Sequence, residues 1–258
     1  TAYAAEDADV TLQLHHRLWP EISNTGRLAA IYDNIEQPLI TVLQGMEYTG
    51  VLIDADLLQQ QSREIGGKLS LLEQQAHDLA GHKFNLGSPK QLQEILFEEL
   101  KLPVMRKTPK GQPSTAEDVL QELADDYELP RVILEHRGLI KLQSTYTDRL
   151  PEQVCARTGR VHTSYSQIGA VTGRLSSNNP NLQNIPIRTE TGRKVRNGFI
   201  ADKGNVLLAV DYSQIELRIV AHMAQDESML AAFRADEDIH STTAGAIYGV
   251  SPEAVTKE

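Results

Sequence analysis

The segment from Asp211 to Arg218 carries residue types that a metal-dependent reaction would need. Asp211 directly follows the apolar run 206–210, which predicts a buried strand, so its carboxylate would lie on rigid scaffold at a sheet edge. Mg²⁺ prefers carboxylate and carbonyl oxygens and leaves positions for substrate phosphates; Asp211 and the Tyr212 carbonyl could supply such ligands. Glu216, one turn into the next helix, would face the same edge. The alternative is a helix cap beside an ordinary surface glutamate.

A second candidate site is the polar stretch from Thr172 to Arg188, which is rich in Asn, Ser and Gly. Its amides and Arg174 can hydrogen-bond base edges and sugars, while the cluster Arg193, Lys194 and Arg196 suits phosphates. The alternative is an irregular surface loop in which these residues only make turns.

The elements that would position these residues change in character along the chain. Apolar spacing and capping residues predict helices over about 3–18, 33–48, 54–79, 88–100, from 114 onward, and 130–150. Within this half we expect Trp19-Pro20 to break the first helix, Asp54 to cap a long helix weakened at Gly66-Gly67, and Ser114 with Glu117 to form a capping box. A further helix is expected to begin at Ser251-Pro252.

From Arg160 the alternation of residues 160–165 predicts a strand, residues 206–210 a buried strand, and residues 215–224 a helix. Helices followed by a mixed sheet place the chain in the α+β class.

Composition excludes some classes of protein. With 258 residues, 40% hydrophobic and 23% charged, the chain is ordinary globular material, and no apolar run is long enough to span a membrane. Its one cysteine, Cys155, cannot form an internal disulfide, which fits a reducing cytoplasm.

The net charge of −10 argues against nucleic acid only as an average. Residues 137–200 carry ten basic and three acidic side chains, a local charge of +7, directly before the carboxylate at Asp211. A positive segment beside a possible metal site favours a polyanionic partner.

Five segments resemble, in the same order, motifs of the family A DNA polymerases, the bacterial DNA polymerase I group. They are Tyr3–Asp7 (last motif of the 3′–5′ exonuclease), Phe84–Leu92 (thumb tip), Leu142–Asp148 (thumb-to-palm junction), Thr172–Arg188 (template-primer stretch) and Asp211–Arg218 (first palm motif). The resemblance implies that residues 1–22 end an exonuclease domain, 23–135 form a helical thumb, and 136–258 begin the palm of a right-hand polymerase.

The resemblance also implies the roles of the palm residues. Asp211 and the Tyr212 carbonyl would be catalytic metal ligands, with two Mg²⁺ ions in the whole protein. The residues expected at the incoming deoxynucleotide are Ser213, Gln214, Ile215, Glu216 and His240. Glu216 would exclude a ribose 2′-hydroxyl, and His240 would meet the phosphates.

Primer-template DNA is the second partner that the resemblance implies. Arg174 and Gln183 would probe the minor groove, whose degenerate pattern suits an enzyme that accepts every correct pair. Residues expected to hold backbone or template are Asn181, Asn184, Arg188, Arg137, Lys141, Ser144 and Tyr146. At the thumb tip Asn85, Ser88 and Lys90 would grip phosphates at a helix start, and residues 107–111 would do likewise.

At the amino end, Tyr3 and Asp7 would be remnants of the exonuclease site, with Asp7 a metal ligand there. Read without the resemblance, Tyr3 is a core residue and Asp7 a surface charge.

The resemblance makes the whole protein a DNA-directed DNA polymerase of replication and repair, cytoplasmic and associated with the nucleoid, monomeric and without a membrane. The family's fingers helix and second palm aspartate are expected after Glu258, so we expect this chain alone to be inactive. The alternatives are a primer-template binding module without catalysis and a single-subunit RNA polymerase, which Glu216 disfavours.

Overall fold

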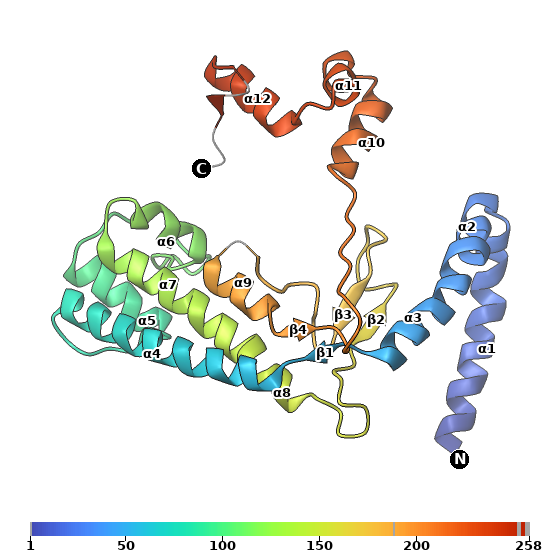
Figure 1. Ribbon diagram of the computed structural model, residues 1–258, viewed down its shortest axis with the longest axis horizontal. Helices are drawn as coiled ribbons and strands as arrows, with labels where there is room; N and C mark the ends of the chain where they lie inside the picture. Colours follow the sequence, from blue (N-terminus) through green and yellow to red (C-terminus); the bar gives the residue numbers. More distant parts are fainter. Residues whose placement is uncertain (1, 188, 252–253, 256–258) are drawn as a thin grey trace. The chain divides into compact units, whose positions relative to one another are not determined.

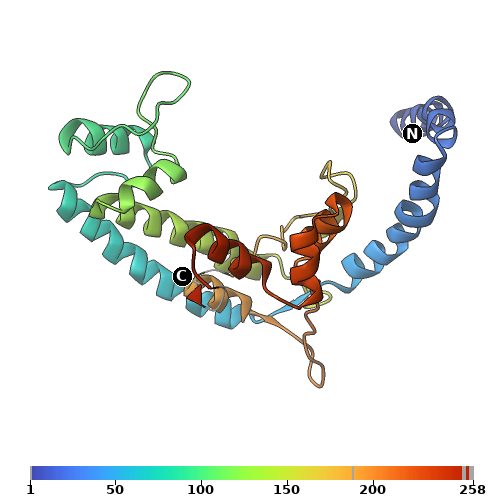
Figure 2. The same cartoon turned by 90° about the horizontal axis from the view of Figure 1, so that it is seen from above.

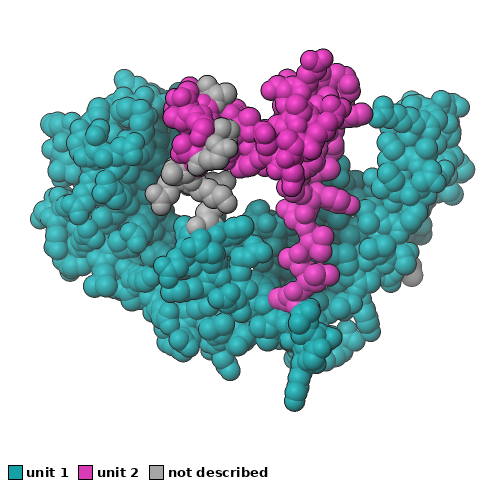
Figure 3. All heavy atoms as spheres, turned by 45° about the horizontal axis from the view of Figure 1, so that its top comes forward, with its two compact units in different colours: residues 1–206 teal, residues 207–258 magenta. Residues whose placement is uncertain are grey.

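The computed structural model describes residues 2–187, 189–251 and 254–255 (Figure 1). The chain divides into two compact units, Thr1–Val206 and Leu207–Glu258, coloured separately in Figure 3. The helices of the first unit are α1 (Ala2–Ser23), α2 (Gly26–Ile31), the π-helix η1 (Tyr32–Glu36), α3 (Gln37–Thr49), α4 (Ala55–Ala80), α5 (Pro89–Gln93), the π-helix η2 (Glu94–Glu99), α6 (Glu117–Ala124), α7 (Glu128–Leu142), the π-helix η3 (Gln143–Thr147), α8 (Arg149–Glu152) and α9 (Glu190–Arg196).

The core of the first unit lies where α4 packs along α7 and η3, with α5, η2 and α6 beyond them (Figures 1 and 2). Helix α4 begins as expected at Asp54, whose Oδ1 accepts a hydrogen bond from the Leu57 N–H at 2.9 Å. It ends at Gly81, which has a left-handed φ of 80°. Helical spacing lines Leu58, Ile65 and Leu72 along its buried face.

Two small antiparallel sheets complete the first unit. Strand β1 (Leu52–Ile53) pairs with β4 (Phe199–Ile200), and β2 (Ser164–Ser166) pairs with β3 (Ser176–Asn178). The predicted strand over 160–165 is therefore shorter and later, because Val161 makes only isolated bridges to Val51 and Val154. Helices with small antiparallel sheets confirm the α+β class.

Two local expectations for the helices are wrong. Helix α1 continues through Pro20 to Ser23, so the missing proline N–H costs one hydrogen bond without ending the helix. Helix α6 begins after Ala116 with no side-chain cap, because the Ser114 hydroxyl accepts instead from the Ala116 N–H at 3.2 Å.

The second unit is helical where it is described, with α10 (Ile215–Ala224), α11 (Glu227–Arg234) and α12 (Ile239–Tyr248). The Asp226 and Asp238 side chains cap α11 and α12 by accepting hydrogen bonds from backbone N–H groups of the first turn. The helix expected to begin at Ser251-Pro252 falls partly on residues outside the described ones.

The predicted buried strand at 206–210 is wrong. These residues have no regular structure, and Val206, Leu208 and Val210 are each 84–85% exposed. An apolar run becomes a buried strand only beside another strand, and no described strand pairs with this one. Among the described residues, no helix has the length and apolarity needed to cross a bilayer.

Candidate nucleic-acid interface

Six of the twelve side chains predicted to hold DNA line two grooves that flank helix α7 in the first unit. The first groove, about 770 Å³, runs between the turn before α5, the 107–113 hairpin and α7. It is lined by Leu86, Gly87, Pro89, Gln93, Thr108, Ser114, Thr115, Ala116, His136, Arg137, Ile140, Lys141 and Ser144. Because α7 turns every 3.6 residues, positions 136, 137, 140 and 141 share one face, and Ser144 follows them in η3. Three of the predicted residues, Arg137, Lys141 and Ser144, therefore lie together.

The predicted thumb-tip residues are not among the lining residues, but they are sequence neighbours of Leu86, Gly87 and Pro89, which are. The Asn85 side-chain oxygen accepts from the Gly87 N–H at 2.8 Å, which shapes the turn. Ser88 is the N-cap of α5, and its hydroxyl accepts from the Gln91 N–H at 3.5 Å. Lys90 is exposed on the first turn of α5. Their polar groups thus surround a helix start, although Asn85 and Ser88 also stabilise the turn itself.

Arg137 is held in place by the protein rather than extended into solvent. Its Nη1 donates to the Thr115 carbonyl oxygen at 2.8 Å, and burial lowers the pKa of its guanidinium, with the Glu117 carboxylate opposing this. Arg137 and Lys141 both line the first groove. The two side chains give this groove two positive charges.

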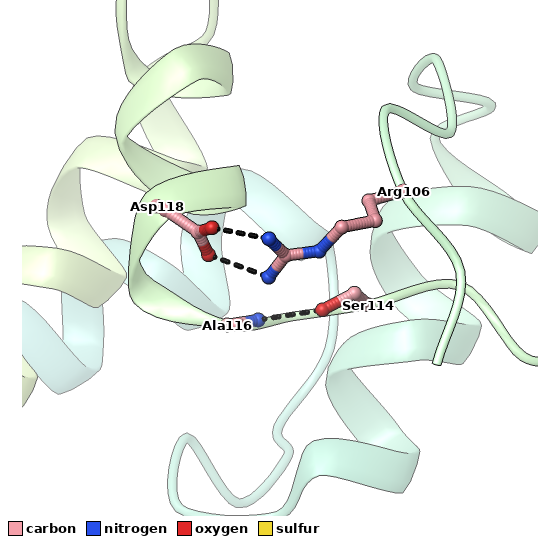
Figure 4. A network of polar contacts seen from close by, with 4 residues as sticks. All are labelled: Arg106, Ser114, Ala116 and Asp118. Carbon is pink, nitrogen blue, oxygen red and sulfur yellow. Dashed lines mark hydrogen bonds and ion pairs between the residues drawn. The ribbon is translucent and has the colours of Figure 1, made fainter. Parts of the chain in front are cut away.

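The basic hairpin at the groove's other edge is fixed by an ion pair, shown in Figure 4. Arg106 Nη1 and Nη2 donate to Asp118 Oδ2 and Oδ1 at 2.5 and 2.8 Å, the two-pronged geometry that orients both groups. The Ser114 N–H also donates to the Arg106 carbonyl, and Lys107 and Pro113 form a bridge. These contacts present Lys107 and Lys110, both exposed, on one short hairpin.

The second groove, about 600 Å³, lies on the other side of α7. It is lined by Leu134, Glu135, Gly138, Leu139, Lys141, Leu142, Thr145, Tyr146, Asn181, Asn184, Pro186, Thr189 and Thr191. It therefore gathers the predicted residues Tyr146, Asn181 and Asn184. Lys141 lines both grooves.

Within the polar stretch the predicted side chains are partly engaged in structure. The buried Tyr146 hydroxyl donates to the Asn184 carbonyl, and burial raises the pKa of this phenol. Gln183 accepts from the Ser177 N–H at 3.1 Å and donates to the Leu175 carbonyl at 2.8 Å. Asn181 accepts from the Gln183 N–H at 2.9 Å. The stretch is thus an internally bonded loop beside the second groove.

Arg174 and Gln183, also predicted to bind DNA, line neither groove. Arg174 is exposed in the loop between β2 and β3. Arg188 lies outside the described residues.

The predicted nucleotide residues belong to the second unit. Asp211, Tyr212 and Ser213 are exposed and precede α10, and Ile215 and Glu216 form its first turn. Gln214 adopts a left-handed φ of 52°, which is uncommon for a residue other than glycine.

Gln214 and His240 meet at a residue that the sequence did not single out. The Gln214 amide donates to Asp238 Oδ1 at 2.7 Å, and the same oxygen accepts from the His240 N–H at 3.2 Å. Hydrogen bonds from Gln214 and then Ser241 lower the pKa of the Asp238 carboxyl. A charged Asp238 thereby connects the 211–216 segment to the start of α12, where His240 lies.

The described residues do not fit a pair of metal ions. No three His, Cys, Asp or Glu side chains gather in the described part of the chain as a metal site would require. Asp211 supplies one carboxylate and Tyr212 one carbonyl, which do not make a two-metal site. Tyr3 and Asp7 lie one turn apart on α1, both exposed, so Tyr3 is not a core residue.

The first groove and the hairpin beside it also contain residues that sequence reasoning missed. His136 is buried in the wall of the first groove, Thr115 holds Arg137, and the Arg106–Asp118 pair fixes the hairpin. All of these depend on contacts between separate elements, so no local sequence signal marks them.

Comparisons with known proteins give a consistent result. The chain is 60% identical over 255 residues to the DNA polymerase I of Pseudomonas aeruginosa, covering 98% of this chain and 28% of that protein. It is 46% identical over 256 residues to the thermostable DNA polymerase I of Thermus thermophilus, covering 99% of this chain and 31% of that protein. The chain thus spans about a third or less of the length of these relatives.

A solved structure described as the POL domain of Pol1 from M. smegmatis, in complex with DNA primer-template and dNTP, has a TM-score of 0.85. It is 38% identical, and the match covers 95% of this chain and 43% of that one. The family model described as DNA polymerase family A matches residues 55–258. With the match extending from the start of α4 through both grooves and the 211–216 segment, the chain belongs to DNA polymerase family A.

Proposed function

We propose that the whole protein is a DNA-directed DNA polymerase, a nucleotidyltransferase that joins a deoxynucleotide to a primer 3′-hydroxyl under the direction of a template. Membership of the family supports this, as does the similarity to a solved domain whose title names primer-template DNA and dNTP. Replication and repair are the processes that such a reaction would serve, in the cytoplasm and at the nucleoid, with the protein acting as a monomer.

One observation carries the DNA-binding part of the proposal. Two grooves flank α7, and six predicted DNA-binding side chains line them: Arg137, Lys141, Ser144, Tyr146, Asn181 and Asn184. Cations and hydrogen-bonding groups along an extended surface suit a sugar-phosphate backbone, which supplies most of the affinity for a duplex. Arg174, Gln183, Arg188, Asn85, Ser88 and Lys90 would extend this surface.

The nucleotide would meet the second unit. We assign its contacts to Ser213, Gln214, Ile215, Glu216 and His240, with Glu216 excluding a ribose 2′-hydroxyl. The link through Asp238 supports grouping Gln214 with His240. In the whole protein, Asp211 would supply one carboxylate to the Mg²⁺ ions that neutralise triphosphate charge, and further carboxylates must come from elsewhere.

Among the described residues, Asp211 is the one carboxylate assigned to the polymerase metal site, and a pair of metal ions needs more than one. We therefore expect the 258-residue chain to bind primer-template DNA without extending it. The second candidate, a binding module without catalysis, is favoured for the chain alone by this same observation. For the whole protein, the first candidate predicts primer extension and the second predicts duplex binding without extension.

The deciding experiment replaces Asp211 by alanine in the whole protein and measures primer extension and duplex affinity together. A polymerase should lose extension by several orders of magnitude while its dissociation constant for primer-template DNA changes little. Extension by wild type and loss in Asp211→Ala support the enzyme. No extension by the wild-type whole protein, with duplex binding intact, would make it the binding module.

We also assign residues 1–22 to the end of a 3′–5′ exonuclease domain, 23–135 to the thumb and 136–258 to the palm. Tyr3 and Asp7 would belong to the exonuclease site, with Asp7 as a metal ligand. Their positions one turn apart on an exposed helix face are compatible with this.

A further inference from the structure

His136 is a buried side chain with unmet hydrogen-bonding capacity, and it lines the first groove. Only 7% of the residue is exposed, and its Nδ1 is enclosed without a hydrogen-bond partner in the described part of the chain. Its Nε2 likewise makes no hydrogen bond to any described residue. Burying a polar group without a partner is costly, so such a group usually has a partner outside the protein or a function.

The surroundings of the ring decide its protonation state. Burial lowers its pKa below the ordinary value of 6.5, the charge on Arg137 lowers it further, and Glu73 of α4 opposes this. At neutral pH the ring is therefore neutral, with one nitrogen a donor and the other an acceptor.

The position of the two nitrogens indicates which one carries the proton. Nδ1 is enclosed, and enclosing an unpaired N–H is less well tolerated than enclosing an unpaired acceptor. The proton therefore belongs on Nε2, leaving this nitrogen as the donor available to the groove whose wall the ring forms.

The rest of the groove indicates the acceptor. Arg137 and Lys141 are its cations, Ser144 and Thr115 add polar groups, and Leu86, Pro89 and Ile140 form apolar wall. Deoxyribose is apolar and phosphate is anionic, so this mixture fits a nucleic-acid backbone.

Resting on the proposed function, we infer that His136 is a further DNA-contacting residue, whose Nε2–H donates to a backbone oxygen of the primer-template duplex in the first groove. The enclosed, unpaired Nδ1 costs the protein stability with or without DNA, whereas the Nε2–H contact is made only with DNA. A merely structural histidine would show the opposite, since its removal would lower stability without affecting DNA.

The test compares duplex affinity with thermal stability in variants of the 258-residue chain. His136→Phe keeps a ring but removes the donor, and we expect its dissociation constant for a primer-template duplex to rise about 2- to 10-fold, the value of one neutral hydrogen bond. Its thermal midpoint should stay the same or rise. His136→Gln, which retains a side-chain N–H, should recover most of the affinity.

The matched control is His82→Gln, since His82 is also a histidine of this helical region but is exposed and paired with Glu99 at 2.9 Å. It should leave duplex affinity unchanged. Wild-type affinity in His136→Phe, or a loss that His136→Gln does not recover and that accompanies a lower thermal midpoint, would overturn the inference.

A measurement on the wild type covers the case in which His136→Phe does not fold. Nitrogen-15 NMR of the ring should show a neutral Nε2–H tautomer whose proton becomes hydrogen-bonded when duplex is added; an unchanged ring signal at saturating duplex would refute the contact. If the wild-type chain binds no duplex at all, the proposal that this chain holds primer-template DNA fails, and the inference fails with it. If the wild-type chain binds duplex, Lys141→Ala weakens that binding and His136→Phe leaves it unchanged, only this inference fails.

Discussion

Several side chains predicted to hold DNA also hold the protein together. Arg137 donates to the Thr115 carbonyl, and the Tyr146 hydroxyl donates to the Asn184 carbonyl. The oxygen and the nitrogen of the Gln183 side-chain amide each make a hydrogen bond to the backbone. Such bonds reduce the side-chain entropy that DNA binding would otherwise cost. Alanine substitutions at these positions will therefore change stability as well as affinity, and the two must be measured together.

The Arg106–Asp118 pair gives a pH-dependent prediction at this scale. Hydrogen bonds from Arg106 lower the pKa of Asp118 from its ordinary 3.8. A lowered native pKa means that the pair favours the ordered hairpin above about pH 4 and is lost as the pH falls through that lowered value. Asp118→Asn should therefore loosen the hairpin at neutral pH.

Amide hydrogen exchange of residues 106–114 checks this. Exchange should be faster in Asp118→Asn than in wild type at pH 7, and the difference should shrink as the pH is lowered below 4. Glu122→Gln on the same helix, which removes an equal charge outside this pair, is the control. Equal exchange in wild type and Asp118→Asn at pH 7 would contradict the positioning role.

What the sequence could predict about the site depended on residue type and local spacing. Arg137 and Lys141, four residues apart, were predictable as one helix face. His136 and Asp238 were not predictable. The unpaired Nδ1 of His136 and the bond between Asp238 and Gln214 both arise from packing between elements distant in sequence.

At the scale of elements, Gly198 and Gly67 differ in whether the structure has room for a side chain. An added Cβ at Gly198 would lie 2.6 Å from Leu58 Cδ2 and 2.9 Å from Leu58 Cγ, so α4 can approach β4 only with glycine there. An added Cβ at Gly67, in the middle of α4, would meet nothing within 4 Å.

Gly198→Ala should therefore destabilise the first unit by about 1–3 kcal/mol, the usual cost of overpacking. Gly67→Ala should stabilise it by about 1 kcal/mol, the helix-propensity difference between the two residues. Urea denaturation of both variants beside wild type measures this. A Gly198→Ala variant as stable as wild type would show that Leu58 can shift aside.

The predicted elements succeeded where a local signal sufficed. The Asp54 cap and the apolar face of α4 are local, and so is the Ser88-Pro89 start of α5. The prediction of a strand at 206–210 was wrong because an apolar run shows only that the residues could be buried. Whether they form a strand depends on a neighbouring strand. Pro20 failed as a breaker because a helix can lose one hydrogen bond and continue.

At the scale of the whole molecule, charge distribution outweighs net charge. The chain carries −10 overall, yet residues 137–200 carry +7 and include α9 and the carboxyl-terminal end of α7. Duplex affinity should consequently fall steeply with salt, as counterions compete for the same cations.

Lys141, shared by both grooves, should account for about one phosphate contact. Lys141→Ala is expected to weaken duplex binding at low salt and to reduce the slope of log affinity against log salt by about 1. Arg131→Ala removes the same charge from α7, but Arg131 bonds the Ala124 carbonyl at 2.8 Å and lines neither groove, so it should leave the slope unchanged. Equal slopes in the two variants would mean that Lys141 contacts no phosphate.

The exposed run at 206–210 has a practical consequence for the biochemistry of this chain. It lies at the boundary of the two units, has no regular structure and presents Leu207 and Leu208 to solvent, which are favourable conditions for protease cleavage. Brief digestion with thermolysin, which cleaves before exposed Leu and Val residues, should therefore cut here first. The grooves and the nucleotide residues would then be on separate polypeptides, so that duplex binding could be assayed without the segment that carries Asp211.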